Sequence, residues 1–144
     1  MGIAFCLALL IPTLSAAKGL KPFASDGCSA FPEGTFTHNE LWLKCCTRHD
    51  FQYWQGGTFK QRVQSDIELK ECVSKVGEPE IALLMLAGVR VGGTPFIPTA
   101  FRWGYGWSYP TFYHPLSTEE KLTIMNSLNQ TNNLPKYIKG SLNQ

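Results

Sequence analysis

The segment WLKCCTRHDFQYW, residues 42–54, brings two cysteines, a histidine and an aspartate together within a few positions. Thiols, imidazoles and carboxylates gather in this way in disulfide frameworks, metal sites and catalytic sites. The segment contains no glycine or proline, so all four side chains can project from a single helix. Which chemistry applies depends on the helix faces that carry them.

Residues four positions apart lie on the same face of a helix. Cys45, His49 and Tyr53 therefore form one stripe. Cys46 and Asp50 form a second stripe, turned by about 100° around the helix axis. Each stripe carries one cysteine and one polar group, so the two thiols are expected to face different neighbours.

Two capping boxes predict a pair of helices around these stripes. The T-x-x-E box at Thr37 predicts a first helix over residues 40–55, which two glycines end. The T-x-x-Q box at Thr58 predicts a second helix that runs to about Val76. The short connection between them favours an antiparallel hairpin.

The register of that hairpin predicts which residues meet across it. His49 comes level with Asp66, and Cys45 comes level with Cys72 in nearly the same register. The mismatch is well within side-chain reach, because a helix rises only about 1.5 Å per residue. The first stripe is therefore expected to make a Cys45–Cys72 disulfide and a contact between an imidazole and a carboxylate.

The second stripe is expected to face the remaining thiol, Cys28, which lies in a loop rich in glycine, proline and serine. A Cys28–Cys46 disulfide would bring this loop onto the face that carries Asp50. Backbone carbonyls of the loop could then join the carboxylate around a cation. Oxygen ligands of this kind suit calcium.

Each of these interpretations has a plainer alternative. The contact between His49 and Asp66 could be a buried hydrogen bond without chemistry, and Asp50 could be an ordinary exposed acid. A zinc site formed by Cys45, Cys46 and His49 is a third interpretation. It is disfavoured because adjacent cysteines point to different faces of a helix.

The N-terminal segment MGIAFCLALLIPTLSAA, residues 1–17, has no charged side chain and ends in small residues. Its apolar run is too short to cross a bilayer, so it predicts a cleaved signal peptide and a secreted or periplasmic domain over residues 18–144, with no transmembrane segment after cleavage. Cleavage would remove Cys6 and leave four cysteines, enough for two disulfides. The net charge of +2 is too small to predict a nucleic-acid partner.

The second half of the chain predicts further helices. Pro79 opens a helix over residues 78–91, which is expected to be buried because it is apolar nearly all round. Residues 92–115 are rich in glycine, proline and aromatic side chains and are expected to be irregular. Ser117 begins a last capping box and a helix to about Asn129. The expected domain is small, mostly helical and disulfide-linked.

These residues resemble the secreted phospholipase A2 family. Its signature Cys-Cys-x-x-His-Asp-x-x-Tyr reads here as CCTRHDFQY, residues 45–53. DIELKEC, residues 66–72, resembles the segment in which the second catalytic aspartate precedes a cysteine, and DGCS, residues 26–29, resembles the calcium loop. The resemblance covers roughly residues 26–73. It implies a mostly α fold with an antiparallel, disulfide-linked helix pair, a calcium loop and extra C-terminal helices.

The resemblance also implies an activity, the calcium-dependent hydrolysis of the sn-2 ester of glycerophospholipids at a membrane or micelle surface. His49 would be the general base, Asp66 would orient it, and Tyr53 would hydrogen-bond Asp66. Asp50 would bind the calcium ion, and the family's disulfide pairing is the one expected above. The alternative is a catalytically inactive module on the same scaffold that binds lipid or protein.

The sequence departs from the family in three respects. Only four cysteines remain after cleavage, of a disulfide framework that is usually denser. CSAFPEG, residues 28–34, replaces the glycine-rich calcium loop of better-known members, so carbonyls of Gly27, Ser29 and Phe31 are the candidate calcium ligands. No amphipathic helix is expected before Asp26 to form a wall of an acyl channel. The third helix and the aromatic segment over residues 94–114 would have to supply that wall.

Overall fold

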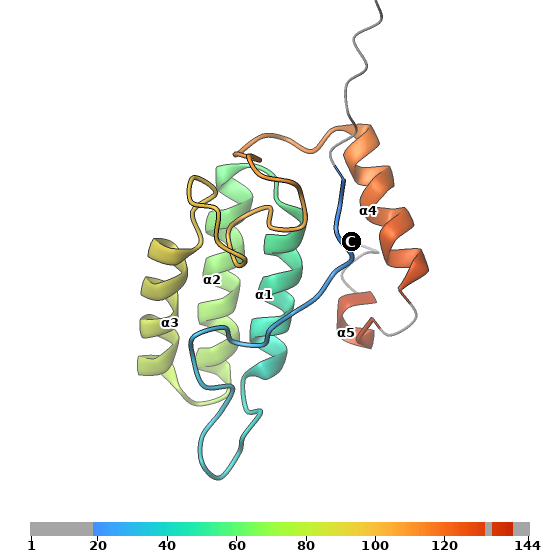
Figure 1. Cartoon of the computed structure of the whole chain (residues 1–144). Coiled ribbons are helices and arrows are strands. Elements are labelled where there is room, and N and C mark those ends of the chain that lie inside the picture. The colour runs from blue at the N-terminus through green and yellow to red at the C-terminus, as the bar shows by residue number, and fades with distance from the viewer. Residues whose placement is uncertain (1–18, 132–133, 140–144) are drawn as a thin grey trace, which may run out of the picture.

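The computed structural model describes residues 19–131 and 134–139 (Figure 1). The signal peptide expected over residues 1–17 lies outside the described residues. The described residues contain no β-strand, only an isolated antiparallel bridge between Leu20 and Trp107. The mostly helical fold is thus confirmed, and the helices are α1 (Leu43–Gln55), α2 (Phe59–Lys75), α3 (Pro79–Gly92), α4 (Thr118–Gln130) and the short α5 (Lys136–Lys139).

Helices α1, α2 and α3 lie side by side, and α4 and α5 lie on the other side of α1 (Figure 1). A hydrophobic cluster fills the space between the first three helices, and it consists of Trp42, Cys45, Cys46, Leu69, Val73, Ala82 and Met85. A second cluster joins the outer face of α1 to the C-terminal helices, and it consists of Phe51, Trp54, Trp107, Ile124, Leu128, Leu134 and Ile138. Because apolar burial on both sides stabilises α1, its side chains are held in fixed directions.

Two of the three expected capping boxes are present. The Thr58 side chain accepts a hydrogen bond from the backbone N–H of Gln61, whose own side chain accepts one from the backbone of Thr58. Ser117 and Glu120 make the same pair of bonds at the start of α4. These local bonds fix where α2 and α4 begin.

The capping box expected at Thr37 is wrong. Helix α1 begins at Leu43, three residues later than the sequence predicted, and no side chain caps its first turn. The preceding residues form a loop instead, because the indole of Trp42 donates to the Pro32 carbonyl at 2.6 Å and the backbone N–H of Trp42 donates to Glu33. The bonds of Trp42 stabilise this loop, and the capping box at Thr37 alone is not enough to start the helix earlier.

Helix α3 is not buried in the way its composition predicted. Ala82 and Met85 are buried, but Leu83, Leu84 and Val91 are exposed by 61%, 58% and 81%. The physical reason is that α3 packs along α2, and no described helix covers its outer face (Figure 1). No described helix is long and apolar enough to cross a membrane.

The segment between α3 and α4 is irregular, as expected, and it folds back over the turn between α1 and α2 (Figure 1). Backbone N–H groups of Gly104 and Gly106 donate to the carbonyls of Tyr53 and Trp54 at 2.7 and 3.2 Å. The buried guanidinium of Arg102 donates to carbonyls within the segment itself. These bonds fix the C-terminal end of α1.

Candidate functional site

The two stripes of α1 face the neighbours that the sequence predicted. Cys45 is disulfide-bonded to Cys72 of α2, with the Cα atoms 5.7 Å apart, and Cys46 is bonded to Cys28 of the preceding loop, with the Cα atoms 5.0 Å apart. Both expected disulfides are thus confirmed. The zinc interpretation is wrong, because neither thiol of the pair is free to bind a metal.

The first stripe brings His49 against Asp66. His49 Nε2 lies 3.0 Å from Asp66 Oδ1, and the two residues are only 6% and 0% exposed. An ionised carboxylate can only accept hydrogen bonds, so Nε2 carries the imidazole proton and Nδ1 is the unprotonated nitrogen. No described residue hydrogen-bonds Nδ1. The imidazole is therefore anchored at one nitrogen and able to accept a proton at the other.

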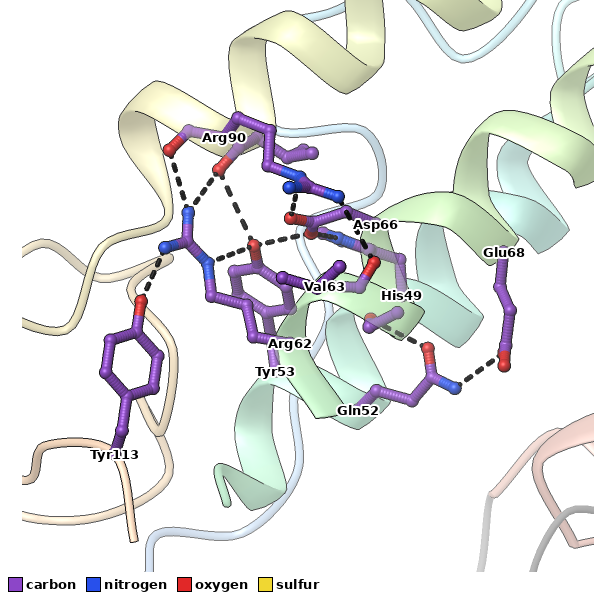
Figure 2. Close-up of polar contacts among 11 residues, drawn as sticks. His49, Gln52, Tyr53, Arg62, Val63, Asp66, Glu68, Arg90 and Tyr113 are labelled. Carbon is purple, nitrogen blue, oxygen red and sulfur yellow. Dashed lines mark hydrogen bonds and ion pairs between the residues drawn. The ribbon is translucent and has the colours of Figure 1, made fainter. Parts of the chain in front are cut away.

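Tyr53 completes the first stripe. Its hydroxyl donates to Asp66 Oδ1 at 2.7 Å and accepts a hydrogen bond from Arg62 Nε at 3.0 Å (Figure 2). Burial, followed by the negative charge of Asp66, raises the pKa of Tyr53. The phenol therefore stays protonated and acts as a donor to the carboxylate, as the resemblance implied.

Asp66 has a further partner, Arg90 of α3, that the sequence did not predict. Arg90 Nε lies 2.7 Å from Asp66 Oδ2, on the carboxylate edge opposite to His49 and Tyr53 (Figure 2). The contact is an ion pair and not a hydrogen bond. Oδ2 accepts no hydrogen bond from any described residue. The buried carboxylate is thus held from both sides.

The sequence contained a signal for the position of Arg62, which bonds the Tyr53 hydroxyl, but none for the contact of Arg90. Arg62 and Asp66 are four residues apart on α2, a spacing that places them on the same face. The contact of Arg90 had no such signal, because it depends on how α3 packs against α2. Ser25, which binds Asp50 as described next, had none either.

The second stripe places Asp50 beside the loop that carries Cys28. The carboxylate is half-buried, and its Oδ2 accepts a hydrogen bond from Ser25 Oγ at 2.6 Å. Burial raises the pKa of Asp50 to about 7, and the nearby charge of Asp26 adds to this rise, while the Ser25 hydrogen bond opposes it. Because Asp50 is half-buried and hydrogen-bonded to Ser25, the interpretation of Asp50 as an ordinary exposed acid is wrong.

The candidate calcium ligands Gly27, Ser29 and Phe31 line the same cavity as Asp50 and His49. The chain turns sharply there, with positive φ at Gly27 (77°) and Ser29 (55°). The described residues contain no cluster of three or more His, Cys, Asp or Glu side chains that could hold a metal. An ion at this place would therefore use backbone carbonyls together with Asp50, and this is oxygen chemistry that suits calcium.

The cavity itself has a volume of about 620 Å³, within the range of pockets that bind small molecules. His49 and Asp50 supply the titratable groups of its lining. The lining is otherwise mostly apolar, and its larger side chains from α2, α3 and the following segment are Leu69, Leu84, Met85, Val89, Val91 and Phe101. Helix α3 and part of the aromatic segment thus form a wall of the cavity. These are the two segments that were expected to supply a wall in place of an N-terminal helix.

Comparison of the chain with protein-family models, curated proteins and solved structures finds no match. What the site can do therefore follows from its own residues. It joins an anchored imidazole, a half-buried carboxylate and an apolar cavity.

Proposed function

We propose that the protein is a calcium-dependent phospholipase of the A2 type, which hydrolyses the sn-2 ester of glycerophospholipids. One observation carries this proposal. The imidazole of His49, with Nε2 on the buried carboxylate of Asp66 and Nδ1 without a hydrogen-bond partner among the described residues, lines the same apolar cavity as Asp50. A base for water and a place for a cation thus border the space in which an acyl chain could lie.

The reaction uses water as the nucleophile. His49 Nδ1 takes a proton from the water as its oxygen attacks the ester carbonyl, and the imidazolium then returns that proton to the departing glycerol oxygen. Asp66 holds the imidazole in the required tautomer and compensates the positive charge that forms on it. The four cysteines of the described residues are all disulfide-bonded, so none of them competes as a nucleophile.

Asp50 and the carbonyls of Gly27, Ser29 and Phe31 would hold the calcium ion. When bound, calcium supplies polarisation of the ester carbonyl and a positive charge for the oxyanion. The support for this assignment is geometric, because the half-buried carboxylate of Asp50 lines the same cavity as Gly27, Ser29 and Phe31.

The surface around the cavity supports a lipid substrate. Residues 81–118 contain no acidic side chain. Leu84, Val91 and Phe101 line the cavity and are also exposed to solvent. Tyr109 is exposed farther along the aromatic segment, and its phenol suits a membrane or micelle interface. Two disulfides further support a secreted or periplasmic location, where thiols are oxidised.

The inactive binding module is kept as a second candidate because of one contact. Ser25 Oγ already satisfies one oxygen of Asp50 at 2.6 Å. If Ser25 holds this carboxylate permanently, the cation would not bind, and the cavity would serve to bind an acyl chain without hydrolysis.

The test is fatty-acid release from mixed phosphatidylcholine and phosphatidylglycerol vesicles labelled in the sn-2 acyl chain. We expect labelled fatty acid and unlabelled lysophospholipid with millimolar calcium and neither product with chelator. Equal release in chelator would contradict the role of calcium, and release from the sn-1 position alone would contradict the assigned reaction. Vesicle binding without any release would favour the binding module.

A further inference from the structure

Two arginines connect α2 and α3 in opposite directions (Figure 2). Arg62 of α2 donates through Nη2 to the carbonyls of Val89 and Arg90, both at 2.9 Å. Arg90 of α3 reaches back to α2, where its Nε lies 2.7 Å from Asp66 Oδ2 and its Nη2 donates to the Val63 carbonyl at 3.3 Å. We call Arg62 and Arg90 the two-arginine clamp.

The position of each arginine in the clamp has a physical reason. The last carbonyls of α3 form the negative end of the helix dipole, so a guanidinium there is stabilised. The Val89 carbonyl also accepts a hydrogen bond from the backbone N–H of Gly93 at 2.9 Å, and the Arg62 guanidinium adds a second donor to it. Arg62 occupies this place with only 5% of its surface exposed. Asp66 is fully buried, and a buried carboxylate requires compensation by a cation or by several donors. Arg90 supplies that cation.

The clamp fixes both edges of the Asp66 carboxylate. Oδ1 meets His49 Nε2 and the Tyr53 hydroxyl, and Oδ2 meets Arg90. Arg62 also donates to the Tyr53 hydroxyl, so the phenol that steadies Oδ1 is tied to the same clamp. Without Arg90, nothing among the described residues would hold Oδ2, and the carboxylate could rotate away from the imidazole.

We propose that Arg90 is a positioning residue, which holds the Asp66 carboxylate so that Oδ1 stays on His49 Nε2. Arg62 keeps the end of α3 in the place from which Arg90 reaches Asp66. The catalytic part of this inference rests on the proposed function, whereas the coupling of Arg90 to Asp66 does not. Because α3 also lines the cavity, the clamp ties the wall of the substrate space to the imidazole.

The kinetic test compares R90Q and R90K with the control R48Q. Arg48 makes an ion pair with Glu68 at 3.3 Å on the same two-helix unit, but its side chain is 53% exposed and does not touch Asp66. For R90Q we expect kcat to fall at least about tenfold with KM changed less than about twofold, because misplaced groups slow chemistry while Arg62 still holds the cavity wall. R90K should recover part of the loss, and R48Q should match the wild type. Equal kcat values for R90Q and the wild type would overturn the proposal.

A second measurement does not depend on activity. Urea unfolding of the wild type, R90Q, D66N and the double variant forms a cycle that isolates the coupling between the two side chains. R90Q should lower the unfolding midpoint clearly in the Asp66 background and much less in the D66N background, because a neutral amide needs no countercharge. Additive effects would overturn the proposal.

The two tests separate the possible failures. A wild type that hydrolyses no phospholipid while the unfolding cycle shows coupling would refute the proposed function and leave Arg90 as the residue that holds Asp66. An active wild type with unchanged kcat in R90Q would refute the positioning role and leave the proposed function. If R90Q does not fold, R90K decides, because it keeps a cation beside Oδ2 but loses the planar guanidinium. Wild-type kcat in R90K would then count against the positioning role.

Discussion

Gly93 lies directly against the phenol of Tyr53. A methyl group in place of its hydrogen would come within 2.6 Å of the Tyr53 hydroxyl oxygen and within 2.7 Å of the Val89 carbonyl. This close approach lets the end of α3 reach the residues that surround Asp66. The packing of α3 against Tyr53 therefore requires a glycine at position 93.

Gly93→Ala should accordingly disturb both the fold and the site. The added methyl group must displace Tyr53 or the end of α3, and overpacking of this kind costs about 1–3 kcal/mol. Unfolding in urea measures the loss. The matched variant is Gly88→Ala, because a methyl group there meets nothing within 4 Å and lies inside helix α3. Gly88→Ala should gain about 0.5–1 kcal/mol from helix propensity, and an equal loss in both variants would contradict this account.

The two disulfides should have different consequences when removed. Cys45→Ser with Cys72→Ser opens a link between α1 and α2, and Cys28→Ser with Cys46→Ser releases the loop that lines the cavity beside Asp50. Each removal should cost about 2–5 kcal/mol of unfolding free energy. Among variants that still fold, only the second should also lose the calcium-dependent rise in melting temperature. Loss of that rise in the first variant alone would contradict the placement of the calcium loop.

Calcium should raise the melting temperature of the wild type, because it binds the folded loop and not the unfolded chain. Asp50→Asn should abolish this rise, since it removes the ionised oxygen ligand while keeping the size of the side chain. Asp26→Asn is the control, since Asp26 acts on Asp50 through its charge and is exposed. A calcium response in Asp50→Asn equal to that of the wild type would remove Asp50 from the site.

The pH dependence of the unfolding free energy, measured in chelator, should reflect the ionisation of the Asp50 carboxylate. The pKa of Asp50 is about 7 in the folded protein against 3.8 for the free side chain, so between these values the folded state binds more protons than the unfolded state. Stability must then fall as pH rises from about 4 to about 7, by an amount on the order of a few kcal/mol at most. Asp50→Asn should lack this decline and be the more stable protein at pH 8. A parallel decline in the variant and the wild type would contradict the assignment.

The sequence predicted the parts of the site that local spacing determines. The i, i+4 stripes of α1 and the capping box at Thr58 were enough to place His49 beside Asp66 and to pair the cysteines. These relations hold because helix geometry and a short hairpin leave little freedom.

The remaining features depend on packing between distant segments. The Thr37 box failed because the loop bonded to Trp42 took its place, and α3 is exposed because no described helix covers its outer face. The ion pair of Arg90 with Asp66 requires the end of α3 to lie beside α2, and no spacing along the chain encodes that contact.

The most direct measurement is the rate of sn-2 fatty-acid release by His49→Gln relative to the wild type, in calcium. Glutamine keeps a donor for Asp66 but cannot take a proton from water near neutral pH. We expect a loss of at least ~10²-fold, with the calcium-dependent rise in melting temperature unchanged because Asp50 is intact. A His49→Gln variant that hydrolyses phospholipid as fast as the wild type would reduce the His49–Asp66 pair to a buried hydrogen bond and contradict the enzymatic proposal.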